Sequence, residues 1–121
     1  MTKFKSTSIA ESIFHAIRGL KLAFSSQKNL VIEIIISCIV IIAALFLKFS
    51  LTDLVLVIII CSLVLICELF NSVIEFTLDA VYKNNYSKLV EMAKDISAGV
   101  VLFIICVSAI AGLLLFGSYI L

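Results

Sequence analysis

The sequence predicts an all-α membrane protein with one domain (1–121), in which an N-terminal amphipathic interfacial helix precedes three transmembrane helices. Apolar residues make up 64% of the 121, and the mean hydropathy is +1.31, so a soluble domain of this size would have too little polar surface. The chain has no proline and only four glycines, which favours long helices over a turn-rich β-fold.

The first predicted element is an amphipathic helix over residues 8–25. Its apolar side chains recur at helical spacing, at Ile9, Ile13, Ile17, Leu20 and Phe24. His15, Arg18 and Lys21 project mainly from the other side. A basic helix of this kind lies in the membrane interface with its cations near lipid headgroups. The alternative is a soluble helix packed on a partner, and the apolar runs that follow favour the membrane surface.

Three apolar runs, 30–47, 54–74 and 98–121, are each close to the ~20 residues that a helix needs to cross ~30 Å of hydrocarbon. The first run is interrupted by Glu33, the second carries Glu68 and Asn71 in its last third, and the third has no charged residue. The first 29 residues mix polar and apolar side chains without a cleavable signal sequence, so we expect the N-terminus to be retained.

Basic residues are distributed unevenly between the predicted loops. Eight of the nine lie before the first run or between the second and third, namely Lys3, Lys5, Arg18, Lys21, Lys28, Lys83, Lys88 and Lys94. Only Lys48 separates the first two runs. The positive-inside rule therefore predicts a cytoplasmic N-terminus, a cytoplasmic 76–97 loop and an external C-terminus.

This topology brings several polar residues to one depth at the cytoplasmic side, and they are Glu33, Glu68, Asn71, Glu75, Lys94 and Asp95. Glu68, Asn71, Ser72, Glu75 and Asp79 also share one helix face. Ionised carboxylates facing lipid near the bilayer centre would cost about 2.5–3.5 kcal/mol each. The stripe is therefore predicted to face a protein interior, a water-filled cleft or a metal ion, although polar residues also serve simply to join helices.

Three functions fit these residues: an ion or proton path, a transporter of cationic substrates, or a metal-assisted enzyme. Carboxylates beside a Lys-Asp pair suit Mg²⁺ and a phosphorylated substrate. The sequence has neither a Walker A motif nor G-x-G-x-x-G, so a nucleotide would depend on metal, lysine and polar groups. A transporter needs access from both faces, yet nothing polar continues from Glu68 toward the outside.

Two motifs carry a family resemblance. They are E-L-F-N-S-V-I-E-F-T-L-D at 68–79 and M-A-K-D at 92–95. Together they resemble the signature of the prokaryotic diacylglycerol kinase family, and F-H-A-I-R-G-L-K-L-A-F at 14–24 resembles its interfacial helix. The resemblance implies a homotrimeric lipid kinase of the bacterial inner membrane, with active sites shared between subunits. It would transfer the γ-phosphate of Mg-ATP to a lipid hydroxyl, and no nucleic-acid partner is implied.

The resemblance also implies roles for single residues. Glu68 matches the general base and Glu75 a metal ligand. The residues matching or falling near nucleotide contacts are His15, Asn71, Asn85, Tyr86, Ser87, Lys94 and Asp95. Arg18, Lys21 and Glu33 fall in segments that flank the lipid. The lipid is diacylglycerol in one branch and undecaprenol in another, and Glu33 favours diacylglycerol because undecaprenol kinases often have histidine there.

The chain departs from the family pattern at two positions. Gln27 stands where the family commonly has a second metal-ligating glutamate, and Ser8 stands where an arginine often serves the nucleotide. An amide oxygen can bind Mg²⁺ but adds no charge, so metal affinity should fall. Three alternatives are then open. Gln27 coordinates Mg²⁺ weakly, Glu33 replaces Gln27 as the metal ligand, or the chain is a slow or catalytically silent relative. We expect activity with a raised Mg²⁺ requirement.

Overall fold

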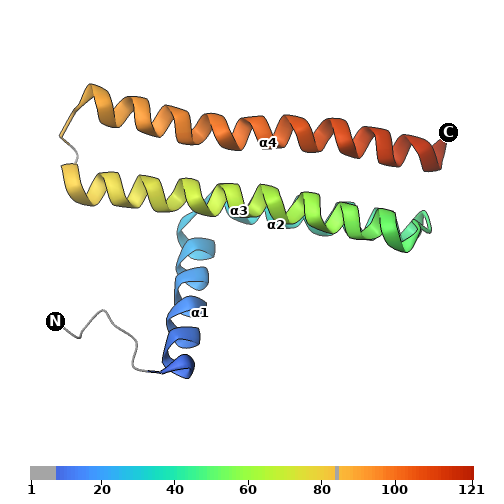
Figure 1. Ribbon diagram of the computed structural model, residues 1–121, viewed down its shortest axis with the longest axis horizontal. Coiled ribbons are helices and arrows are strands. Elements are labelled where there is room, and N and C mark those ends of the chain that lie inside the picture. Colours follow the sequence, from blue (N-terminus) through green and yellow to red (C-terminus); the bar gives the residue numbers. More distant parts are fainter. Residues whose placement is uncertain (1–7, 84) are drawn as a thin grey trace.

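The structure is a computed structural model that describes residues 8–83 and 85–121. Over these residues the chain forms four α-helices and no strand: α1 (Ile9–Ser26), α2 (Lys28–Phe46), α3 (Leu51–Tyr82) and α4 (Lys88–Ile120). Helix α3 packs against both α2 and α4, and α1 leaves this bundle at a steep angle (Figure 1). The prediction of an all-helical chain is confirmed.

Local signals explain where the helices begin and end. Ser8 and Ser50 cap the N-termini of α1 and α3, each accepting a 3.2 Å hydrogen bond from a backbone N–H three residues later. Helix α3 ends at Tyr82, and its C-cap residue Lys83 has a left-handed backbone and donates its N–H to the Asp79 carbonyl. Gln27 alone separates α1 from α2, and its extended backbone makes the corner between them.

Among the described residues, three helices are long and apolar enough to cross a membrane, namely α2, α3 and α4. The 19 residues of α2 measure about 28 Å, close to the hydrocarbon thickness. The 32 residues of α3 and the 33 of α4 measure about 48–50 Å. The short 47–50 turn starts α3 level with the end of α2, so the extra length lies at the opposite end, where α3 connects to α4 (Figure 1).

The helix boundaries correct one prediction. The predicted extent of the 76–97 loop is wrong, because α3 continues to Tyr82 and α4 already begins at Lys88. Hydropathy marks only the part of a helix that contacts lipid, whereas the backbone hydrogen bonds continue into the polar region. We call the short connection between these two helices, with described residues 83 and 85–87, the link. We call the 47–50 segment the turn.

The turn is tied to the C-terminal part of α4 by Tyr119. Its hydroxyl donates to Asp53 Oδ2 at 2.6 Å and accepts the Ser50 N–H at 2.9 Å. Its ring stacks on Phe49 with 4.0 Å between centroids. We call these contacts the Tyr119 clasp. They join α4 to the turn and to the start of α3 at one end of the bundle.

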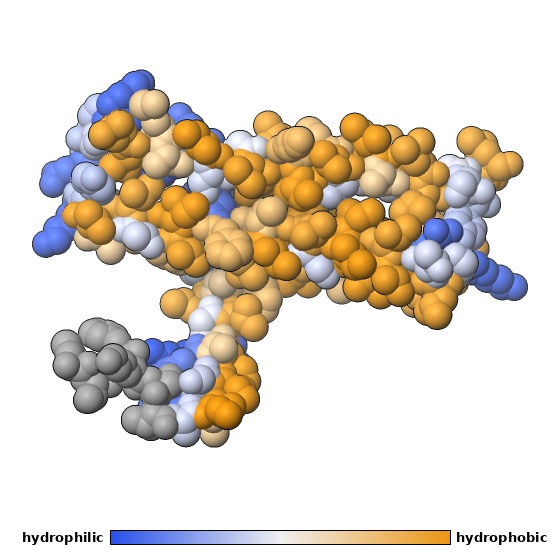
Figure 2. Space-filling model, viewed as in Figure 1, coloured by the Kyte–Doolittle hydropathy of each residue, from blue (hydrophilic) through white to orange (hydrophobic). Residues whose placement is uncertain are grey.

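Few side chains are buried in the single chain. On its surface, apolar side chains cover the middle of the bundle and hydrophilic ones gather at the ends (Figure 2). Those buried among the described residues are five apolar ones, Leu30, Ala44, Val57, Val64 and Val101, and five polar ones, Ser37, Glu68, Asn71, Ser72 and Ser97. Four of the five polar ones lie on the half of α3 and α4 near the link. The helix contacts therefore bury polar groups toward the link, where the sequence predicts the site.

Candidate active site

A group of three carboxylates lies where α2 meets α3. Glu68 on α3 is only 4% exposed, and Glu33 on α2 and Glu75 on α3 lie close enough for their charges to act on it. Both neighbours are half-buried. Two negative charges beside a buried carboxylate are unfavourable unless a cation or a proton compensates them. The arrangement can therefore accept a proton or attract a cation.

The predicted polar stripe of α3 faces the protein at its deeper end and solvent at its outer end. Glu68, Asn71 and Ser72 are buried, Glu75 is half-buried and Asp79 is exposed. From Glu68 to Asp79 the stripe extends eleven residues, about 16 Å along the helix. It thus extends from the buried middle of α3 toward the link.

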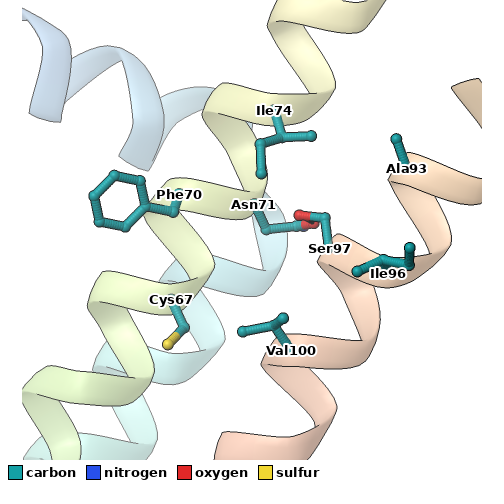
Figure 3. A pocket seen from close by; sticks show the side chains of 8 residues that line it. All are labelled: Cys67, Phe70, Asn71, Ile74, Ala93, Ile96, Ser97 and Val100. Carbon is teal, nitrogen blue, oxygen red and sulfur yellow. Dashed lines mark hydrogen bonds between the residues drawn. The ribbon is translucent and has the colours of Figure 1, made fainter.

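Helix α4 contacts this stripe at two points. At the first, the Ser97 hydroxyl donates to Asn71 Oδ1 at 2.7 Å, and both side chains are buried. Figure 3 shows the pair pointing across an apolar pocket of about 430 Å³ between α3 and α4. The bond uses the Asn71 oxygen, so its amide N–H groups can serve a ligand.

The sequence prediction missed Ser97. It lies three residues after Lys94, so the two share one face of α4. That spacing from a predicted site residue is the signal by which it could have been found.

The second point is an ion pair near the link. Lys94 Nζ lies 2.6 Å from Asp79 Oδ1, and both residues line a pocket of about 300 Å³. We call it the link pocket, and Asn85, Tyr86 and Ser87 also line it. Ser87 is the N-cap of α4, but its side chain makes no capping hydrogen bond. The uncapped N-terminus of a long helix favours anions, so the pocket combines a cation, a helix terminus and several hydrogen-bonding groups.

The predicted residues of α1 lie apart from these pockets. His15, Arg18 and Lys21 are exposed on a helix that points away from the bundle (Figure 1). His15 Nε2 lies 3.9 Å from Glu11 Oε1 within α1. Neither the link pocket nor the Asn71–Ser97 pocket has an α1 residue in its lining. Within the described chain, α3, α4 and the link therefore come together, and α1 does not join them.

A protein-family model described as prokaryotic diacylglycerol kinase matches residues 14–116. The chain belongs to the prokaryotic diacylglycerol kinase family. It is 32% identical over 101 residues to a diacylglycerol kinase of Synechocystis sp., covering 84% of this chain and 58% of that relative. It is 28% identical over 106 residues to an undecaprenol kinase of Bacillus subtilis, covering 88% and 85%. The chain thus spans little more than half of the Synechocystis relative's length.

Family membership confirms the resemblance drawn from the two motifs, and the structure explains why the motifs occur together. The 68–79 motif lies on α3 and the 92–95 motif on α4, where Asp79 meets Lys94. Asp95 follows Lys94 and is exposed. The two motifs of this diacylglycerol kinase family member therefore form facing halves of one polar strip.

The residues present fit a magnesium ion of the kind that kinases use. No group of three or more His, Cys, Asp or Glu side chains able to hold a metal ion occurs in the described part of the chain. Mg²⁺ in kinases, however, is usually held by one or two carboxylates together with water and substrate phosphates. Glu75 is half-buried and lies close enough to Glu68 for its charge to act on that carboxylate, so one or two carboxylates are available for such a site.

Proposed function

We propose that this protein is a lipid kinase that transfers the γ-phosphate of ATP to the hydroxyl of a membrane lipid. The observation that carries the proposal is the continuous polar strip from buried Glu68 to the link pocket. It lies in a member of a family whose relatives are named for lipid kinases. A strip of this kind joins a membrane-embedded reaction centre to an aqueous nucleotide site.

The order of residues along the strip suggests how the nucleotide is oriented. Asn85, Tyr86 and Ser87 of the link pocket bind the outer part of the nucleotide, and Lys94 binds its phosphates. Because Glu68 lies about 16 Å deeper than Asp79 along α3, the triphosphate must point inward, toward Asn71 and Glu75. Asp95, next to Lys94, belongs to the same site.

Glu68 acts as the general base of the reaction. A lipid hydroxyl becomes a good nucleophile when its proton is accepted, and the buried Glu68 carboxylate is the proposed acceptor. Phosphoryl transfer otherwise depends on positioning and on neutralising charge. Mg²⁺, when bound, would neutralise the phosphate oxygens. Glu75 and Gln27 are the proposed ligands, and the uncharged Gln27 accounts for the raised Mg²⁺ requirement that we expect.

The position of α1 supports assembly of more than one copy, which we propose to be a homotrimer. His15 is proposed to contact the nucleotide, yet α1 points away from the link pocket of its own chain (Figure 1). A site that includes His15 then needs a second copy. Arg18 and Lys21, on the same helix, are proposed to bind the lipid headgroup at the inner face of the bacterial cell membrane.

A groove supports a lipid as the phosphate acceptor. It has a volume of about 600 Å³, and side chains of α2, α3 and α4 line it. Its lining is almost entirely apolar, and Glu33 is its charged member, on the side nearer Glu68. Such a groove suits an acyl chain whose polar end reaches Glu33 and Glu68. We propose diacylglycerol as the substrate and phosphatidic acid as the product, with undecaprenol as the alternative.

The test is a phosphotransfer assay in mixed micelles. Purified protein with Mg-ATP is offered diacylglycerol and undecaprenol in parallel, and Glu68→Gln and Glu75→Gln are compared with Asp53→Asn. The control neutralises a carboxylate of the same helix at the opposite end of the bundle and is expected to remain active. Transfer to neither lipid by a correctly assembled trimer would contradict the proposal.

A further inference from the structure

The Asp79–Lys94 ion pair is short although it is exposed, and a contribution to folding stability does not explain this. Its side chains are 52% and 36% exposed, and water screens a pair of this exposure, so it contributes little to folding. Its geometry is nevertheless close, at 2.6 Å, and it connects two long helices at the edge of the link pocket. The pair therefore requires another explanation.

The pair restricts where the Lys94 ammonium can lie. A lysine carries its charge on a flexible four-carbon stem and loses rotamer freedom when it binds a ligand. Asp79 sits on the last turns of α3, so its carboxylate holds the ammonium between α3 and α4. The ammonium has three donors and this contact uses one, so two remain for a phosphate.

We propose that Asp79 is a positioning residue that holds the Lys94 ammonium ready for the phosphates of the nucleotide. The inference rests on the proposed function, in which the link pocket takes ATP. Asp79 also has an opposing effect, because its negative charge repels phosphates. Positioning predicts that losing the carboxylate weakens nucleotide binding, whereas repulsion alone predicts that losing it strengthens binding.

Glu91 supplies a matched control for the charge. It lines the same pocket, but its carboxylate lies 3.3 Å from Lys88 Nζ and is not the partner of Lys94. Asp79→Asn and Glu91→Gln each remove one negative charge from the pocket. Only the first removes the contact that fixes the Lys94 ammonium.

The experiment measures nucleotide binding and kinetics of the full chain in mixed micelles. The Kd of β,γ-methylene-ATP with Mg²⁺ is measured alongside KM for ATP and KM for the lipid. Asp79→Asn is expected to raise the nucleotide Kd and KM about two- to tenfold, the cost of immobilising one flexible side chain, and to leave KM for the lipid unchanged. Glu91→Gln is expected to lower the nucleotide Kd, and Asp79→Glu to recover part of the loss because it keeps the carboxylate.

A Lys94→Met background provides the decisive comparison. If Asp79 acts through Lys94, adding Asp79→Asn to this background causes no further loss of affinity. An equal loss with and without Lys94, or a lowered Kd in Asp79→Asn, would overturn the proposal. Nucleotide binding by a wild-type chain that phosphorylates no lipid would refute the kinase function while the variants still decide the role of Asp79. A wild-type chain that binds no nucleotide would overturn both.

Discussion

Replacing Ser97 by alanine tests the cross-helix contact at the deeper end of the strip. The substitution removes the hydroxyl that donates to Asn71 Oδ1 at 2.7 Å and leaves that oxygen, in a side chain only 9% exposed, without this donor. An unsatisfied buried group costs about 1–3 kcal/mol in soluble proteins, whereas side-chain hydrogen bonds in membrane proteins average about 0.6 kcal/mol. Because the pair borders a pocket, we expect a loss between these two values, so the free energy of unfolding should fall by about 1 kcal/mol.

The assay is SDS-induced unfolding in mixed micelles, followed by circular dichroism. Ser118→Ala is the matched control, because the Ser118 hydroxyl donates to the Leu115 carbonyl within the same helix α4 and its loss should cost less than about 0.5 kcal/mol. A double-mutant cycle with Asn71→Ala should return a coupling energy of about 1 kcal/mol. Equal midpoints for Ser97→Ala and Ser118→Ala, or zero coupling, would refute the assignment of this bond as a link between α3 and α4.

Three further outcomes follow from the same structure. Gln27→Glu should raise activity at limiting Mg²⁺ and have little effect at saturating Mg²⁺, and an unchanged Mg²⁺ titration would show that Gln27 is not the source of a metal deficit. Glu68→Gln should lower kcat about 10²-fold or more while nucleotide affinity is kept, and near-normal turnover would remove Glu68 from the role of base. Tyr119→Phe loses the hydrogen bonds to Asp53 and Ser50 and should lower the free energy of unfolding by about 1.5 kcal/mol. Because the clasp is remote from the link pocket, KM for ATP should stay constant, and a raised KM would contradict that separation.

The membrane helices could be predicted from sequence because lipid imposes a simple requirement. A run such as 54–74 has to be apolar and helical, since no water satisfies its backbone groups. The continuation of α3 to Tyr82 was not predictable in this way, because residues 75–82 lie beyond that requirement and contain polar side chains. Helix propensity and the left-handed end at Lys83 decide that boundary instead.

The polar stripe was predictable from spacing alone, but its partners were not. Periodicity places Glu68, Asn71 and Asp79 on one face of one helix. Which residue of α4 lies opposite each depends on the length of the link and on helix rotation, and neither is encoded in a local pattern. The pairing of Ser97 with Asn71 and of Lys94 with Asp79 is therefore given by the arrangement of α3 and α4 and not by sequence spacing.

The Tyr119 clasp makes the two ends of the bundle mechanically unequal. At the turn, an aromatic stack and two hydrogen bonds fix the C-terminal part of α4 against the start of α3. At the other end, the link joins the same helices covalently, and the Asn71–Ser97 hydrogen bond and the Asp79–Lys94 ion pair add contacts between them. Non-covalent contacts can open locally, whereas the covalent connection at the link cannot. Loss of the Tyr119 contacts would therefore free the C-terminal end of α4 from α3, while the link keeps the other end of the α3–α4 hairpin in register.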